Sequence, residues 1–204
     1  MLDGWARRRL DPLLDRLAAR LAAAGATPNA ITVGACAVGL LAAAAIAAQW
    51  YLVGLALLLV SRLGDGLDGA VASITGKTDL GGFLDIVLDF VFYGAIPLGF
   101  VLLDPTANAI AGAVLIFSFY VNGASFLAYA VMAEKRGEST DARGAKSLFF
   151  TTGLAEATET ILFFIAFCLL PAWFPVLACV FAALTFYTAL SRIVLAASAF
   201  RNKT

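Results

Sequence analysis

The sequence contains no histidine and few cysteines, and both features limit the chemistry that it can perform. Without histidine, zinc or iron sites with histidine ligands are excluded, and so is a Ser-His-Asp triad. Cys36, Cys168 and Cys179 are far apart in apolar runs, which is typical of small hydrophobic side chains in helices. Any reaction must therefore use carboxylates, lysine, arginine, hydroxyl groups or a hard metal ion.

Charged residues are also scarce: they make up 14% of the 204 residues, whereas 62% are hydrophobic and the mean hydropathy is +0.92. Apolar runs of about 20 residues recur along the chain, and runs of this length are typical of transmembrane helices. The alternation with period two that marks barrel strands is absent. The sequence therefore predicts membrane-spanning helices, because lipid offers the backbone no hydrogen-bond partners.

The apolar runs predict six transmembrane helices in a single membrane domain that covers residues 1–204. We expect the spans at residues 30–48, 52–73, 80–103, 107–133, 147–170 and 174–200, which form a bundle over residues 30–200. Residues 1–25 combine a leucine stripe with several arginines, as in a helix that lies in the headgroup plane. A cleaved signal peptide fits this segment less well, because the apolar run comes late. The expected fold is thus an all-α integral membrane protein with an amphipathic interfacial helix.

Basic residues predict the orientation of the spans. The connections after the first, third and fifth spans contain no lysine or arginine. The connections after the second and fourth spans contain Lys77, Lys135, Arg136, Arg143 and Lys146. Basic loops remain in the cytosol. Both termini are therefore expected on the cytosolic side of the cytoplasmic (inner) membrane.

Four aspartates interrupt the apolar pattern where the second span ends and the third begins: Asp65, Asp68, Asp85 and Asp89. Spacings of three and four residues place each pair on one face of its helix. The short cytosolic loop folds the two helices into a hairpin, so we expect the pairs to face each other below the membrane surface. Carboxylates there repel one another and lose hydration, and divalent cations such as Mg²⁺, Mn²⁺ or Ca²⁺ offset both effects. Acids inside a membrane usually indicate function.

The same stretch resembles the signature of the CDP-alcohol phosphotransferases (CDP-alcohol phosphatidyltransferases), D-x2-D-G-x2-A-R-x8-G-x3-D-x3-D. Here it reads Asp65-x2-Asp68-Gly69-x2-Ala72, then Gly81-x3-Asp85-x3-Asp89. The segment TPNAIT before the first span is similar to a second pattern of this family. The sequence departs from the signature in two places: Ser73 replaces the arginine, and the spacer at residues 74–80 is one residue short.

The resemblance implies a phospholipid-biosynthetic transferase that moves a phosphatidyl or similar group from a CDP-linked lipid to a small polar alcohol and releases CMP. It implies two divalent cations, Mg²⁺ or Mn²⁺, bound by Asp65, Asp68, Asp85 and Asp89. Asp89 is also the expected general base that takes the proton of the acceptor hydroxyl. The active site is then expected on the cytosolic side. The resemblance also implies a homodimer in the lipid bilayer. We expect no nucleic-acid partner.

The resemblance also implies a donor-binding set made of Asn29, Gly69, Ala72, Ser73, Lys77 and Gly81. The small residues leave room for the cytidine group. Lys77 in the same loop, or Arg62 one helical turn before Asp65, is a candidate to supply the positive charge that Ser73 lacks.

Charged residues of both signs lie near the last two spans, so the identity of the acceptor alcohol stays open. Arg143, Lys146 and Arg192 fit a phosphorylated acceptor such as glycerol 3-phosphate or inositol phosphate. Glu156 and Glu159 lie three residues apart on one helix face. They fit an unphosphorylated acceptor such as serine, inositol or choline, or an ion pair with Arg192. Alternatively, Arg143, Lys146 and Lys135 only set the topology.

Two other classes of protein compete with the transferase interpretation. A cation transporter also places aspartates in its spans, but it predicts acids throughout the depth of the bilayer. Here the four aspartates cluster near one side. An inactive homologue that acts as a scaffold is the other alternative, because Ser73 replaces the signature arginine.

Overall fold

The computed structural model describes residues 2–136 and 157–201, and these ranges contain helices and no strand. The helices are α1 (Leu2–Ala23), α2 (Pro28–Ala47), α3 (Tyr51–Thr75), α4 (Asp79–Leu103), α5 (Pro105–Lys135), α7 (Ala157–Leu169), the 3-10 turn η1 (Pro171–Trp173) and α8 (Phe174–Arg201). The prediction of an all-α protein is confirmed. The first part of the expected fifth span lies outside the described residues.

Local capping signals explain where the long helices begin. Thr27 and Thr78 accept hydrogen bonds through their hydroxyls from the backbone N–H groups of Ala30 and Gly81, at 3.3 and 3.0 Å. A carboxylate oxygen of Asp104 accepts one at 3.1 Å at the start of α5. Prolines occupy the first turns of α2 and α5, where their missing N–H groups are not needed. The five predicted spans that the structure describes from end to end match the observed helices to within two residues at each end.

Four of the described helical segments are long and apolar enough to cross a membrane: α2, α4, α5 and residues Pro171–Ser198. Helix α3 has 25 residues, as many as α4, but it carries the charged residues Arg62, Asp65 and Asp68. Helix α7 is described over 13 residues. The structure therefore supports a membrane protein with four candidate spans, and the count of six spans stays a prediction.

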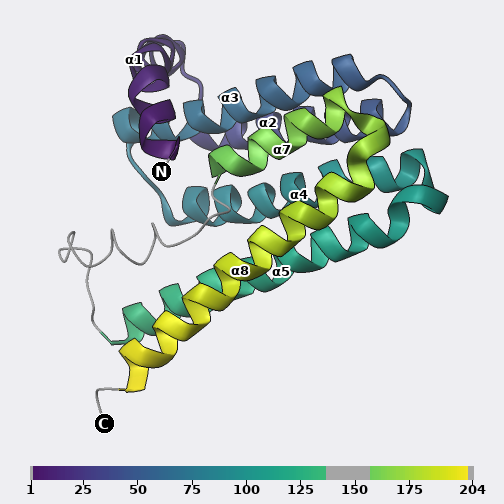
Figure 1. Ribbon diagram of the computed structural model, residues 1–204. Helices are drawn as coiled ribbons and strands as arrows, with labels where there is room; N and C mark the ends of the chain where they lie inside the picture. The colour runs from purple at the N-terminus through teal and green to yellow at the C-terminus, as the bar shows by residue number, and fades with distance from the viewer. Residues whose placement is uncertain (1, 137–156, 202–204) are drawn as a thin grey trace.

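The helices are arranged so that the connection between α3 and α4 lies at the same end of the molecule as the last turns of α5 and α8 (Figure 1). Helix α2 packs against α3 and α4, and α5 runs beside α8 in the same direction. Lys77, Lys135 and Arg136 therefore gather at this end. Trp50 and Trp173, at the connections of the opposite end, are 65% and 60% exposed. This distribution fits the predicted orientation, but the side of the membrane that the termini face stays a prediction.

Helix α1 lies across the direction of α2 and α3 at the end of the bundle and packs against α3 (Figure 1). Ala18 is fully buried, and Leu14 lies beside Gly66 of α3, where an added Cβ would be 3.2 Å from Leu14 Cδ1. Leu13 and Leu17 remain 54% and 38% exposed. The helix thus contacts the protein with one apolar strip and leaves a second one exposed. Its role as an amphipathic interfacial helix at the membrane surface stays a prediction.

Phenylalanine side chains form the core between α4, α7 and α8. Six of them are fully buried: Phe92, Phe100, Phe164, Phe167, Phe174 and Phe181. Phe100 stacks on Phe174 with ring centroids 4.7 Å apart, and Phe163 stacks on Phe181 at 4.3 Å. Stacked and edge-on aromatic pairs stabilise a core beyond the contact area that they bury. This core holds α4, which carries two of the four aspartates, against α7 and α8.

Helices α2 and α4 approach closely at Gly99, because a side chain there would meet backbone. An added Cβ at Gly99 would lie 2.7 Å from the carbonyl oxygen of Ala43. Small residues at helix contacts allow this kind of close approach in membrane proteins. The contact sets the distance between α2 and α4.

We expect Gly99→Ala to lower the free energy of unfolding by about 1–3 kcal/mol, because the added methyl group forces the α2 backbone away. The measurement is the unfolding midpoint of the purified protein in detergent. Gly94→Ala is the matched control on the same helix, since an added Cβ at Gly94 meets nothing within 4 Å. Equal midpoints for the two variants would contradict the close contact.

Candidate active site

The hairpin of α3 and α4 brings three of the four signature aspartates together. The connection turns at Gly76, whose φ of +105° is favourable for glycine. Asp65 and Asp68 on α3 and Asp85 on α4 each offer a carboxylate oxygen, and these three oxygens lie within 4.8 Å of one another. The three residues are called the carboxylate cluster below. Their role as metal ligands is a proposal that this geometry supports.

The burial of Asp68 within the carboxylate cluster fits a bound cation. Asp68 is 6% exposed, and its Oδ2 atom is buried without a hydrogen-bond partner among the described residues. An unpaired carboxylate oxygen in such a position is costly unless a positive charge compensates it. Divalent cations such as Mg²⁺ and Mn²⁺ prefer oxygen ligands of this type. The donor set is therefore suitable for a hard divalent ion.

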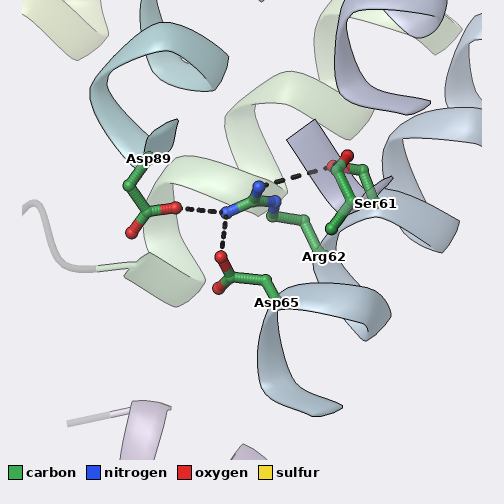
Figure 2. Close-up of polar contacts among 5 residues, drawn as sticks. Ser61, Arg62, Asp65 and Asp89 are labelled. Carbon is green, nitrogen blue, oxygen red and sulfur yellow. Dashed lines mark hydrogen bonds and ion pairs between the residues drawn. The ribbon is translucent and has the colours of Figure 1, made fainter. Parts of the chain in front are cut away.

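Asp89 is not part of the carboxylate cluster and instead pairs with Arg62, as Figure 2 shows. Arg62 Nη1 donates a hydrogen bond to Asp89 Oδ1 at 2.7 Å and lies 3.4 Å from Asp65 Oδ1. Arg62 Nη2 donates to Ser61 Oγ at 3.4 Å. The sequence places Asp89 among the metal ligands, and that assignment stays a prediction. Among the described residues, the basic side chain that pairs with Asp89 is Arg62.

A first cavity, of about 680 Å³, opens beside the carboxylate cluster between the start of α2 and the α3–α4 hairpin. Besides Asp68 and Asp85, its lining includes five of the six predicted donor-binding residues: Asn29, Gly69, Ala72, Lys77 and Gly81. A Cβ added at Gly69 would meet nothing within 4 Å, so this glycine leaves open space in the cavity wall.

The sixth predicted donor residue, Ser73, lies elsewhere. Its side chain is exposed, and its hydroxyl donates a hydrogen bond to the carbonyl of Gly69 at 2.9 Å within the same helix. Ser73 does not line the first cavity. Lys77 does line it, so of the two basic residues considered as replacements for the missing arginine, Lys77 is the one at the cavity.

A second cavity, of about 320 Å³, lies between α4, α5, α7 and α8. Its polar lining consists of Asp89, Tyr93, Asn122, Thr160, Thr185 and Arg192. Aromatic rings of Phe90, Phe119 and Phe126 complete the walls. Asp89 therefore stands between the carboxylate cluster and a pocket that has hydrogen-bonding groups and one arginine in its described lining.

Arg192 is held by α5. Its Nη1 atom donates hydrogen bonds to the carbonyl oxygen and Oδ1 of Asn122 at 3.1 and 2.9 Å, and to Ser125 Oγ at 2.8 Å. The structure shows no ion pair between Arg192 and Glu159, both of which it describes. The Oε2 atom of Glu159 is buried without a hydrogen-bond partner in the described chain, and Glu159 lines neither cavity. Arg143, Lys146 and Glu156 lie outside the described residues.

The sequence pattern of the family described as CDP-alcohol phosphatidyltransferase matches residues 25–190, which include both cavities and the hairpin. The chain belongs to the CDP-alcohol phosphatidyltransferase family. The inner membrane protein YnjF of Escherichia coli (strain K12) is 45% identical over 193 residues, which cover 95% of this chain and 94% of that protein. The family predicted from the signature is therefore confirmed, and a relative named as an inner membrane protein supports a membrane location.

Solved structures of this family share the fold. The phosphatidylinositol phosphate synthase PgsA1 of Mycobacterium tuberculosis with CDP-DAG bound superposes with a TM-score of 0.71 at 20% identity, over 90% of this chain and 92% of that chain. The same synthase in complex with manganese and citrate gives a TM-score of 0.70 at 20% identity, over 89% and 87% of the two chains. This member of the family therefore has the fold of that synthase.

Several site residues were missed by sequence analysis. Asn122 and Ser125 position Arg192, and Thr32 lines the first cavity. Asn122 had a detectable signal, because an amide in the middle of an apolar span needs a partner. Arg62 was considered only as a substitute for the missing arginine, but it is absent from the lining of the first cavity and faces the aspartates.

We expect Asp68→Asn to remove the stabilisation that Mn²⁺ gives to the protein, because it removes the most buried charge of the carboxylate cluster. At about 100 times its dissociation constant, Mn²⁺ should stabilise the wild type by about 2.7 kcal/mol. The measurement is the unfolding midpoint in detergent, with EDTA and with Mn²⁺. Asp79→Asn, on an exposed residue of the same hairpin, is the control and should keep the wild-type response. A full Mn²⁺ response in Asp68→Asn would remove Asp68 from the ligand set.

Proposed function

We propose that this protein transfers a phosphatidyl or similar substituted phosphate group from a CDP-linked lipid to a small polar alcohol, with release of CMP. One observation carries the proposal: the carboxylate cluster lies beside a cavity lined by Asn29, Gly69, Ala72, Lys77 and Gly81, and Asp89 faces a second polar cavity. The two cavities provide separate places for a donor and an acceptor on either side of the acids.

The first cavity is the proposed donor site. Its glycines leave room for a nucleotide, and Lys77 supplies a positive charge for the diphosphate where Ser73 cannot. The acyl chains of the donor remain in lipid beside the helices. The PgsA1 structure with CDP-DAG bound supports a CDP-linked lipid as the donor of this fold.

Asp65, Asp68 and Asp85 would hold a divalent cation, Mg²⁺ or Mn²⁺. Such an ion stabilises the charge that develops on the oxygens of the diphosphate during displacement at phosphorus. The manganese complex of PgsA1 supports a divalent metal in this fold. The second ion that the signature implies would require an oxygen of Asp89 as a ligand.

Asp89 is the proposed general base. Its Oδ1 atom is bound to Arg62, and the residue lines the second cavity. An acceptor hydroxyl in that cavity can give its proton to the Asp89 carboxylate. Its oxygen then forms a bond to the phosphorus that carries the lipid, while the bond from this phosphorus to the bridging oxygen breaks. CMP leaves with the bridging oxygen.

The second cavity is the proposed acceptor site, and its described lining favours a phosphorylated alcohol. Arg192 lines the cavity, whereas Glu159 lies outside it and does not neutralise Arg192. A guanidinium binds phosphate through several N–H groups at once. Glycerol 3-phosphate and inositol phosphate are acceptors of this class. Serine, inositol and choline are the unphosphorylated alternatives.

The test is CMP release from CDP-diacylglycerol by the purified protein in detergent with Mg²⁺ or Mn²⁺. Phosphorylated and unphosphorylated alcohols are offered in parallel, and the lipid products are identified by mass spectrometry. We expect one lipid product per CMP released, loss of the reaction with EDTA, and a rate at least about 100-fold lower for Asp89→Asn. A cation transporter or an inactive scaffold would release no CMP with any acceptor.

We expect Arg192→Gln to raise the KM of a phosphorylated acceptor about tenfold or more, because a charged hydrogen bond to phosphate is lost. The KM of the CDP-linked donor should stay close to that of the wild type. Arg192→Lys keeps the charge and is the matched variant, which should recover part of the acceptor affinity. An unchanged acceptor KM in Arg192→Gln would place the acceptor outside the second cavity.

A further inference from the structure

Arg62 occupies a central position among the signature aspartates. It lies on α3, one turn before Asp65, and its Nη1 atom contacts carboxylate oxygens from both α3 and α4. Its side chain is only 9% exposed. Of the described residues, Arg62 is the one that makes ion pairs with these aspartates.

Three helices build the pocket that holds Arg62. The guanidinium lies over the ring of Phe92 on α4, with Cζ 3.6 Å from the ring centroid. Ser61 accepts a hydrogen bond from Nη2 and donates its own hydroxyl to the carbonyl of Ala35 on α2 at 2.7 Å. Gly39 on α2 makes room for this arrangement, because an added Cβ would lie 2.6 Å from Phe92 Cδ2 and 2.9 Å from Ser61 Oγ.

Removing one partner of a buried ion pair destabilises a protein, because the other charge stays buried without compensation. This holds for the arginine and for the carboxylate alike. The Nε atom of Arg62 is buried without a hydrogen-bond partner in the described chain. The charge of the group is therefore compensated mainly by Asp89 at 2.7 Å and Asp65 at 3.4 Å. Packing against Phe92 fixes the guanidinium plane, so the direction of the bond to Asp89 is also fixed.

We propose that Arg62 is a built-in cation of the active site, which holds Asp89 at the second cavity and takes the place of a second divalent ion. This inference rests on the proposed function. A single metal ion is then bound by Asp65, Asp68 and Asp85, and Asp65 lies between that ion and Arg62. Arg62 acts as a positioning residue, because it contacts Asp89 rather than the substrates.

The geometry favours this role over two others. A donor-binding role for Arg62 is disfavoured, since the residue does not line the first cavity. A second divalent ion bound to Asp65 and Asp89 would lie next to the guanidinium that already contacts both. The repulsion between a divalent ion and a guanidinium at such a distance, in surroundings less polar than water, lowers the affinity for that ion.

The experiment counts Mn²⁺ bound to the purified, substrate-free protein in detergent by electron paramagnetic resonance. We expect one Mn²⁺ per chain for the wild type. Arg62→Met removes the built-in charge, so we expect a second Mn²⁺ per chain or an affinity about tenfold higher. Without metal, the unfolding midpoint of Arg62→Met should lie below that of the wild type. Mn²⁺ should raise the unfolding midpoint of Arg62→Met by more than it raises that of the wild type.

Three matched variants separate charge from structure. Arg62→Lys keeps the charge, so it should bind one Mn²⁺ but turn over more slowly, because an ammonium lacks the planar fork that orients Asp89. Asp89→Asn should still bind one Mn²⁺. Arg136→Gln removes an exposed arginine far from the aspartates in the sequence and should match the wild type. If Arg62→Met does not fold, the counts for the wild type, Arg62→Lys and Asp89→Asn decide the question.

Two Mn²⁺ per wild-type chain, reduced to one in Asp89→Asn, would overturn the inference and leave the proposed function intact. The same holds if Arg62→Met folds and binds Mn²⁺ with the count and affinity of the wild type. A wild type that binds no Mn²⁺ and releases no CMP would instead overturn the proposed function, and this inference with it.

Discussion

The structure depends on the compensation of four carboxylates in an apolar helical hairpin, of which Asp68 is buried and Asp65 and Asp89 are partly buried. Asp68 is nearly inaccessible and has an oxygen without a hydrogen-bond partner in the described parts of the chain, while Asp65 and Asp89 share one guanidinium. Charges in such surroundings are stable only beside opposite charges. The chain supplies one of these charges itself through Arg62, and the proposed divalent cation would supply the other at the carboxylate cluster.

The same compensation divides the site into two halves. Asp68 and Asp85 face the larger cavity, and Asp89 faces the smaller one. Arg62 contacts both Asp65 of the carboxylate cluster and Asp89, so it links the groups beside the two cavities. A transfer reaction between two substrates needs this arrangement, because the acceptor oxygen must reach the phosphorus while the leaving group is held elsewhere.

The rest of the helical bundle fixes the positions of these charged groups relative to one another. The phenylalanine core fixes α4 against α7 and α8, and the contact of Gly99 with Ala43 fixes its distance from α2. Helix α5 positions Arg192 through Asn122 and Ser125. The second cavity is therefore lined by residues of four helices, and the packing of these helices decides which polar side chains line it.

The helices and their limits were predictable from the sequence, because caps, prolines and apolar runs act over a few residues. The pairing of aspartates on each helix face was equally local, and the family followed from the signature. The contact of Asp89 with Arg62 was not predictable, since the two residues are 27 positions apart and meet only through the rotation of α4 against α3. In the same way, tertiary packing directs Arg192 to Asn122 rather than Glu159, and places Lys77 but not Ser73 at the first cavity. Sequence spacing determines which residues share one face of a helix, whereas packing between helices decides which of these faces contact each other.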